Sequence, residues 1–167
     1  MNRLAIAGMV VALLMSALIS TAPSSSGQDA SSSDPELREI EEFNHRFTAA
    51  NLSMDNAKVM ALWADDGVSL QPDSAPMVGK KTITRWLDEI VAQMPGYRVT
   101  KDEAEFHDIQ VAGDWASEWG TTHQIVQPPG GKPAIETFGK ILLVLHREPD
   151  GAWKIEKEMW NAGVRPK

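Results

Sequence analysis

The chain has 167 residues, of which 43% are hydrophobic, and a formal net charge of −7. This length and composition predict one globular domain and not two. The acidic balance argues against nucleic acid as a partner, because phosphate binding needs clustered Lys and Arg residues. The chain contains no cysteine, which excludes disulfides, thiolate catalysis and cysteine metal sites.

The first 22 residues have the pattern of a signal peptide. Arg3 supplies a positive start, and residues 4–19 are nearly all apolar. This run is shorter than the ~20 apolar residues of a membrane-spanning helix, so we expect cleavage and no stable anchor; an uncleaved anchor is the alternative. The cleavage bond stays open, because Pro23 directly follows the small residue Ala22. The expected location is therefore secreted or periplasmic.

Helical periodicity dominates the first half of the remaining chain. Residues 23–34 are Ser-rich and lack aromatic side chains, which predicts a disordered spacer. After this spacer, apolar residues recur at three- and four-residue steps. The sequence therefore predicts three helices, at about 35–50, 53–63 and 80–94.

Alternation replaces the helical period in the second half. Turn residues divide this part into predicted strands, and one short strand precedes the third helix. These strands are at 68–71, 97–112, 115–127, 135–147 and 153–160. Helices followed by hairpin-linked strands predict an α+β domain over residues 35–164, with three N-terminal helices packed on a curved antiparallel sheet.

Six short motifs follow one another along this domain. They are Leu62–Gly67, Pro76–Lys80, Gly113–Ala116, Gly139–Lys140, Asp150–Ile155 and Met159–Asn161. In this order they resemble the NTF2-like superfamily, in particular its SnoaL-like and DUF4440 domains, which are related in fold to ketosteroid isomerase. The resemblance implies a cone-shaped domain with an apolar pocket between sheet and helices, and a homodimer through the outer sheet face. It implies little about the reaction, because one fold supports many activities.

The central hairpin predicts which side chains face the helices. If the chain turns tightly at 113–114, His107 and Glu118 share a face with the apolar Ile109. An apolar face is the covered one, so His107 and Glu118 are predicted to point inward as a catalytic acid/base pair. The alternative is structural: Glu118 is solvated near the rim or pairs with Lys140, and His107 makes a simple polar contact.

Further polar and aromatic residues are candidates for ligand binding. They are Asn44, Trp63, Trp86, Lys140, Glu158 and Asn161. The two tryptophans are equally compatible with a role in the core. Glu158 and Asn161 end the last strand where the resemblance implies an Asp and an Asn, and a bulge would change the face they occupy. The four histidines lack paired ligand spacing, so we predict no metal and no cofactor.

The opposite face of the sheet is predicted to carry Trp115, Trp119, His123 and Ile125, which favours a dimer interface there. Scattered exposed aromatic residues are the alternative. The catalytic residues of ketosteroid isomerase do not transfer, because Tyr97, the only tyrosine, lies at a strand start. The sequence thus favours an exported pocket protein that binds a small apolar ligand or acts on it by acid/base chemistry, with isomerase-, cyclase- or lyase-like activity. The alternative is a non-catalytic dimerisation or protein-interaction module.

Overall fold

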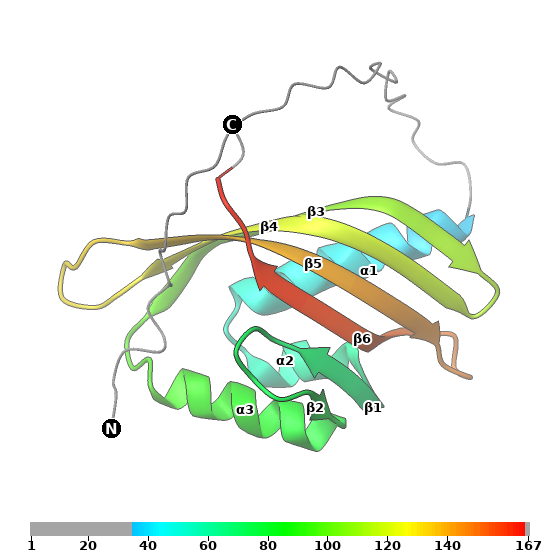
Figure 1. Ribbon diagram of the computed structural model, residues 1–167, viewed down its shortest axis with the longest axis horizontal. Coiled ribbons are helices and arrows are strands. Elements are labelled where there is room, and N and C mark those ends of the chain that lie inside the picture. Colours follow the sequence, from blue (N-terminus) through cyan, green and yellow to red (C-terminus); the bar gives the residue numbers. More distant parts are fainter. Residues whose placement is uncertain (1–34, 166–167) are drawn as a thin grey trace, which may run out of the picture. The chain divides into compact units, whose positions relative to one another are not determined.

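The computed structural model of the protein describes residues 35–165 (Figure 1). The predicted signal peptide at 1–22 and the spacer at 23–34 lie outside these residues. Within the described part, no helix is both long enough and apolar enough to cross a membrane.

Three helices form, as predicted: α1 (Pro35–Leu52), α2 (Asn56–Ala61) and α3 (Lys80–Ala92). The side chain of Asp55 begins α2 by accepting hydrogen bonds from the backbone N–H groups of Ala57 and Lys58. α1 buries the apolar stripe that its periodicity predicts, namely Ile40, Phe43, Phe47 and Ala50.

One six-stranded sheet has the order β2-β1-β6-β5-β4-β3. Its strands are β1 (Trp63–Leu70), β2 (Met77–Val78), β3 (Arg98–Ala112), β4 (Trp115–Gln127), β5 (Ile135–Arg147) and β6 (Trp153–Ala162). β1 runs parallel to β6, and all other neighbours are antiparallel. The predicted α+β fold is confirmed, with α1 lying against a curved, mainly antiparallel sheet (Figure 1).

The start of β1 differs from the prediction. Trp63 was expected to end the second helix, but it begins a strand of eight residues, and the short strand β2 was not expected. The cause is a distant contact: Trp63 pairs with Ile155 of β6, and the N–H of Ile155 donates to the carbonyl of Leu62. Such pairing between strands far apart in sequence overrides local helical periodicity.

The core lies between the helices and the face of the sheet that they cover, called the inner face below. Fully buried side chains there include Phe43 of α1, Leu143 and Leu145 of β5, and Ile155 of β6. The other face is called the outer face. Along β4 the buried positions alternate with exposed ones, so residues two apart share a face.

Candidate functional site

Glu118 on β4 is a buried carboxyl group that faces α1. Its side chain is 2% exposed, and its Oε2 accepts a hydrogen bond of 2.8 Å from Nδ2 of Asn44. Glu118 Oε1 and Asn44 Oδ1 are buried and have no hydrogen-bond partner in the described part of the chain. Burial raises the pKa of Glu118 to about 7, against the opposing effect of the Asn44 hydrogen bond. The structure therefore brings together two of the predicted site residues.

His107 does not join this pair, so the predicted arrangement of His107 and Glu118 is wrong. His107 pairs with Trp119 on the outer face, and its ring lies against the indole with the centroids 4.6 Å apart. The turn at 113–114 is as tight as expected, but β3 contains a bulge at Asp108. Asp108 adopts a φ of 51°, and together with Ile109 it opposes a single residue of β4. Because of this extra residue, His107 lies on the opposite face of the sheet from the one that a regular strand would give it.

A second carboxyl group lies on the inner face in the same row as Glu118. Leu143 of β5 pairs with Glu118 on one side and with Glu158 of β6 on the other. Two strand spacings, about 10 Å, separate the backbones of these glutamates. Glu158 reaches the inner face because β6 contains one extra residue, Glu156, between the partners of Leu145 and Val144.

Glu158 is held by a glutamine from the neighbouring strand. Nε2 of Gln71 donates to Glu158 Oε1 at 2.7 Å and to Oγ of Ser69 at 3.1 Å. Oε2 of Glu158 makes no hydrogen bond or ion pair to any described residue. Burial raises the pKa of Glu158 to about 7, although the Gln71 hydrogen bond acts in the opposite direction.

Glu158 lines a pocket of about 340 Å³ between the helices and the inner face. Three indoles contribute to its walls, those of Trp63, Trp86 and Trp160, and the rest of the wall mixes aliphatic side chains with polar ones. The indole of Trp160 packs directly against Gly139. Any side chain at position 139 would collide with it, because even a Cβ there would overlap the indole. The pocket therefore places the carboxyl group of Glu158 beside aromatic surface.

A third carboxyl group lines the same pocket from β3. Asp102 Oδ2 accepts a hydrogen bond of 2.7 Å from Nε2 of Gln124. Burial raises the pKa of Asp102, while the Gln124 hydrogen bond lowers it. Glu118 is not among the residues that line the pocket. It lies on β4, two strands from Glu158 on β6, in the row that the two glutamates share.

The predicted ligand-binding residues divide between the two faces. Trp63, Trp86 and Glu158 line the pocket, and Asn44 contacts Glu118. Lys140 and Asn161 pair with each other on the outer face, and both are exposed, so their predicted place in this pocket is wrong. The reason is strand alternation, because the neighbouring Ile141 points inward.

Sequence reasoning missed Gln71, Ser69, Asp102 and Gln124. The alternation of apolar residues in β3 changes along the strand: they occupy even positions at Ala104 and Phe106 but odd ones from Ile109 onward. This change would have predicted that Asp102, at an even position, faces inward. No local signal marks Gln71, whose position depends on the pairing of β1 with β6.

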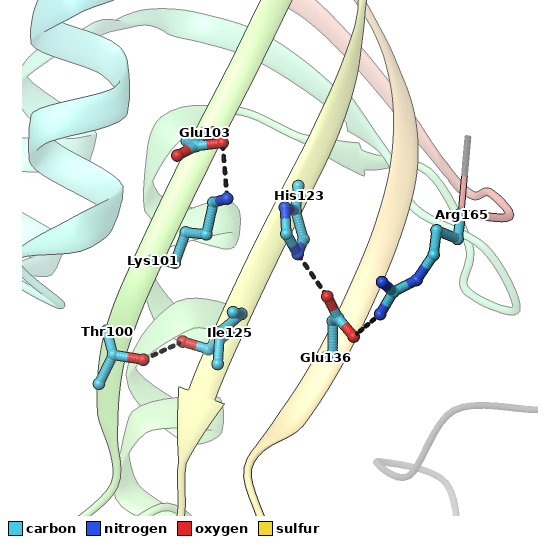
Figure 2. A network of polar contacts seen from close by, with 7 residues as sticks. All are labelled: Thr100, Lys101, Glu103, His123, Ile125, Glu136 and Arg165. Carbon is cyan, nitrogen blue, oxygen red and sulfur yellow. Dashed lines mark hydrogen bonds and ion pairs between the residues drawn. The ribbon is translucent and has the colours of Figure 1, made fainter. Parts of the chain in front are cut away.

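His123 lies on the outer face, as the alternation of β4 predicts (Figure 2). Its Nε2 is 2.8 Å from Oε1 of Glu136, which also pairs with Arg165, and its ring stacks on Phe138. This network holds the imidazole away from the carboxyl groups of the inner face. Among residues 35–165, no group of three or more His, Asp or Glu side chains is placed to hold a metal ion.

The comparisons with known proteins agree with this architecture. The family model described as the SnoaL-like domain matches residues 35–158. No curated protein sequence matches the chain. A ketosteroid isomerase-like protein from Erwinia carotovora is similar in structure, with a TM-score of 0.68 and 20% identity, over 79% of this chain and 99% of the other.

Two further solved structures are similar. A proposed dehydratase of the NTF2-like family from Streptomyces avermitilis has a TM-score of 0.65 and 19% identity, over 77% of this chain and 97% of the other. An NTF2-like protein of unknown function from Pseudomonas putida has a TM-score of 0.59 and 21% identity, over 77% and 87%. At such identities the likeness concerns the fold alone. The family match covers most of the chain, and the protein therefore belongs to the SnoaL-like domain family.

Proposed function

We propose that the protein binds a small apolar molecule in the pocket beneath the helices and transfers a proton to or from it through Glu158. The observation that carries this proposal is the position of Glu158: a carboxyl group that has an oxygen without a hydrogen-bond partner among the described residues and that lines a pocket walled by three indoles. A group whose pKa lies near the ambient pH exchanges protons readily in both directions. Glu158, with a pKa of about 7, meets this condition.

The arrangement supports a simple proton shuttle. As a carboxylate, Glu158 accepts a proton from an activated C–H bond of the ligand, and as the acid it returns that proton to another ligand atom. Gln71 orients the carboxyl group through Oε1, which leaves Oε2 toward the reaction. Such chemistry supports an isomerisation or an elimination, in line with neighbours named as ketosteroid isomerase-like and as a proposed dehydratase.

The test separates binding from turnover. Native mass spectrometry of the protein purified from its source organism identifies a co-purifying small molecule, which then serves in binding and turnover assays. Glu158→Gln should lower turnover by about 10²–10⁴-fold, a larger change than its effect on binding. The matched control is Glu156→Gln, a change at the bulge residue two positions before Glu158, and it should leave binding and turnover unchanged. Unaltered turnover in Glu158→Gln would remove the acid/base role, and loss of binding alone would reduce Glu158 to a ligand contact.

We further propose a homodimer through the outer face. Trp119, Leu142 and Met159 form one row across three strands and are 47%, 44% and 40% exposed. A protein rarely leaves such a contiguous apolar row in water, and a symmetric pair of faces would cover it. Trp119→Glu should convert a dimer to a monomer in analytical ultracentrifugation, whereas Leu52→Glu on α1 should not. A wild-type monomer would contradict the proposal, and so would a dimer that withstands Trp119→Glu. A dimer without any pocket ligand would favour the alternative function, an interaction module.

Export is the last part of the proposal. The support is the signal-peptide pattern of residues 1–22. Mass spectrometry of the protein from its source organism should find a mature N-terminus beyond residue 20. An N-terminus that retains residues 1–19 would contradict cleavage and favour the anchored alternative.

A further inference from the structure

The pocket holds two carboxyl groups, and its lining has no Lys or Arg side chain. Its titratable lining residues are Asp102, Glu158 and His123. His123 does not neutralise the carboxyl groups, because its ring is engaged on the outer face with Glu136 (Figure 2). A buried carboxylate without a counter-ion is costly, so an ionised Asp102 or Glu158 would gain from a cationic ligand.

Two helix ends add to this negative field. Asn51 and Ile90, which line the pocket, lie in the last turns of α1 and α3. The carbonyl end of a helix carries a partial negative charge, which a basic residue in the last turn often offsets. Neither α1 nor α3 has a basic residue in its last turn. Groups of the chain such as Ser53 and Gln93 donate hydrogen bonds to carbonyls at these ends, so the helix ends add a partial negative charge and no open ligand position.

The walls favour the same kind of ligand. The faces of the indoles of Trp63, Trp86 and Trp160 are electron-rich, and indole is the best side chain for attracting an organic cation. The same indoles accept a flat apolar body by stacking. The wall thus combines apolar contact with a preference for positive charge.

We propose that the ligand of this pocket is an organic ammonium ion with a flat apolar body, whose N–H group donates to Oε2 of Glu158. The inference rests on the proposed function and names the ligand class of that site. The ammonium group supplies the counter-ion that the lining lacks, and Gln71 keeps the carboxylate in place through Oε1. A bound cation also favours the ionised form of Glu158, and the second lone pair of Oε2 stays open to accept a proton from the ligand.

Three probes of similar shape test the charge preference. Calorimetric titration of the wild-type protein is done at about pH 8, where an alkylamine is protonated and Glu158 is ionised. The probes are 1-naphthylmethylamine, 1-naphthylmethanol and 1-naphthoate. The amine should bind at least about tenfold more tightly than the alcohol, as expected for a charge-assisted contact, and the carboxylate should bind most weakly.

Equal binding of amine and alcohol, or tighter binding of the carboxylate, would overturn the ammonium inference and leave the apolar pocket intact. Absence of binding for all three probes would overturn the proposed pocket function itself, and the inference with it. Glu158→Gln should reduce the preference for the amine while retaining binding of the alcohol; Asp102 and the indoles account for what remains. Glu103→Gln is the matched control, because Glu103 lies next to Asp102 but on the outer face, where it pairs with Lys101, and this variant should bind like the wild type (Figure 2). An undiminished preference for the amine in Glu158→Gln would contradict the assigned contact.

Discussion

Asn44 and Glu118 face each other across the core. They share one hydrogen bond, and each has one buried oxygen without a hydrogen-bond partner among the described residues. Nδ2 donates to Oε2 at 2.8 Å, while Oδ1 of Asn44 and Oε1 of Glu118 lack partners in the described part of the protein. A carboxylate in this buried position lacks the donors that would stabilise its charge, apart from the one amide of Asn44. The neutral form of Glu118 is therefore favoured, which agrees with its raised pKa.

Glu118 should make stability depend on pH. Its pKa rises from 4.5 to about 7 on folding, so between these values the folded state holds a proton that the unfolded state has lost. The free energy of unfolding should consequently fall as pH rises from about 4.5 to 7, by up to about 3 kcal/mol from this group, and then level off. Urea unfolding of the wild type and Glu118→Gln over this range should show a smaller decline in the variant. Parallel curves would contradict the raised pKa, because the titrating group would then lie elsewhere.

Asn44→Ala should destabilise the fold without touching the pocket wall. The change removes the only hydrogen bond that the described residues make to this buried carboxyl group, and the expected loss is about 1–3 kcal/mol. The loss should be larger at pH 8 than at pH 5, since the ionised carboxylate depends more on its donor. Denaturant titration at both values measures it. The double variant Asn44→Ala with Glu118→Leu should recover part of the lost stability, because it leaves no unpaired polar side chain at this position in the core. A double variant less stable than Asn44→Ala would argue against this account.

His107→Ala should leave ligand binding and turnover unchanged. The imidazole lies on the outer face against Trp119, and the bulge at Asp108 separates it from the carboxyl groups of the inner face. Any effect should appear in the monomer–dimer equilibrium, because Trp119 belongs to the exposed apolar row. Binding assays and sedimentation of the same variant distinguish these outcomes. A tenfold loss of turnover with an intact dimer would return His107 to the active site.

The three helices, the four long strands after them, the α+β class and the inward orientation of Glu118 could be predicted because they depend on local periodicity and one tight turn. Glu158 could be proposed as a site residue, but its face could not be assigned. Two single-residue bulges, at Asp108 and Glu156, reverse strand faces, and their consequences extend along a whole strand. The contact between Gln71 and Glu158 spans 87 residues of sequence and arises from a parallel pairing that no local pattern encodes. The site was thus hardest to predict where it depends on register between distant strands.

Gly139→Ala adds only one methyl group, but it should lower the stability of the protein and weaken ligand binding in the pocket. A Cβ at this position of β5 would overlap the indole of Trp160 and the hydroxyl of Thr122, which hydrogen bond to each other at 3.1 Å. Because one of these groups must move, we expect a loss of about 1–3 kcal/mol in the free energy of unfolding and weaker binding of flat ligands. Denaturant titration and probe binding measure the two effects. The compensating double variant Gly139→Ala with Trp160→Leu should regain part of the stability, since the smaller side chain removes the overlap, but it should not regain binding, since the indole wall is gone. Full stability of Gly139→Ala alone would show that the ring has room to shift, and the close approach of Trp160 would then not depend on glycine.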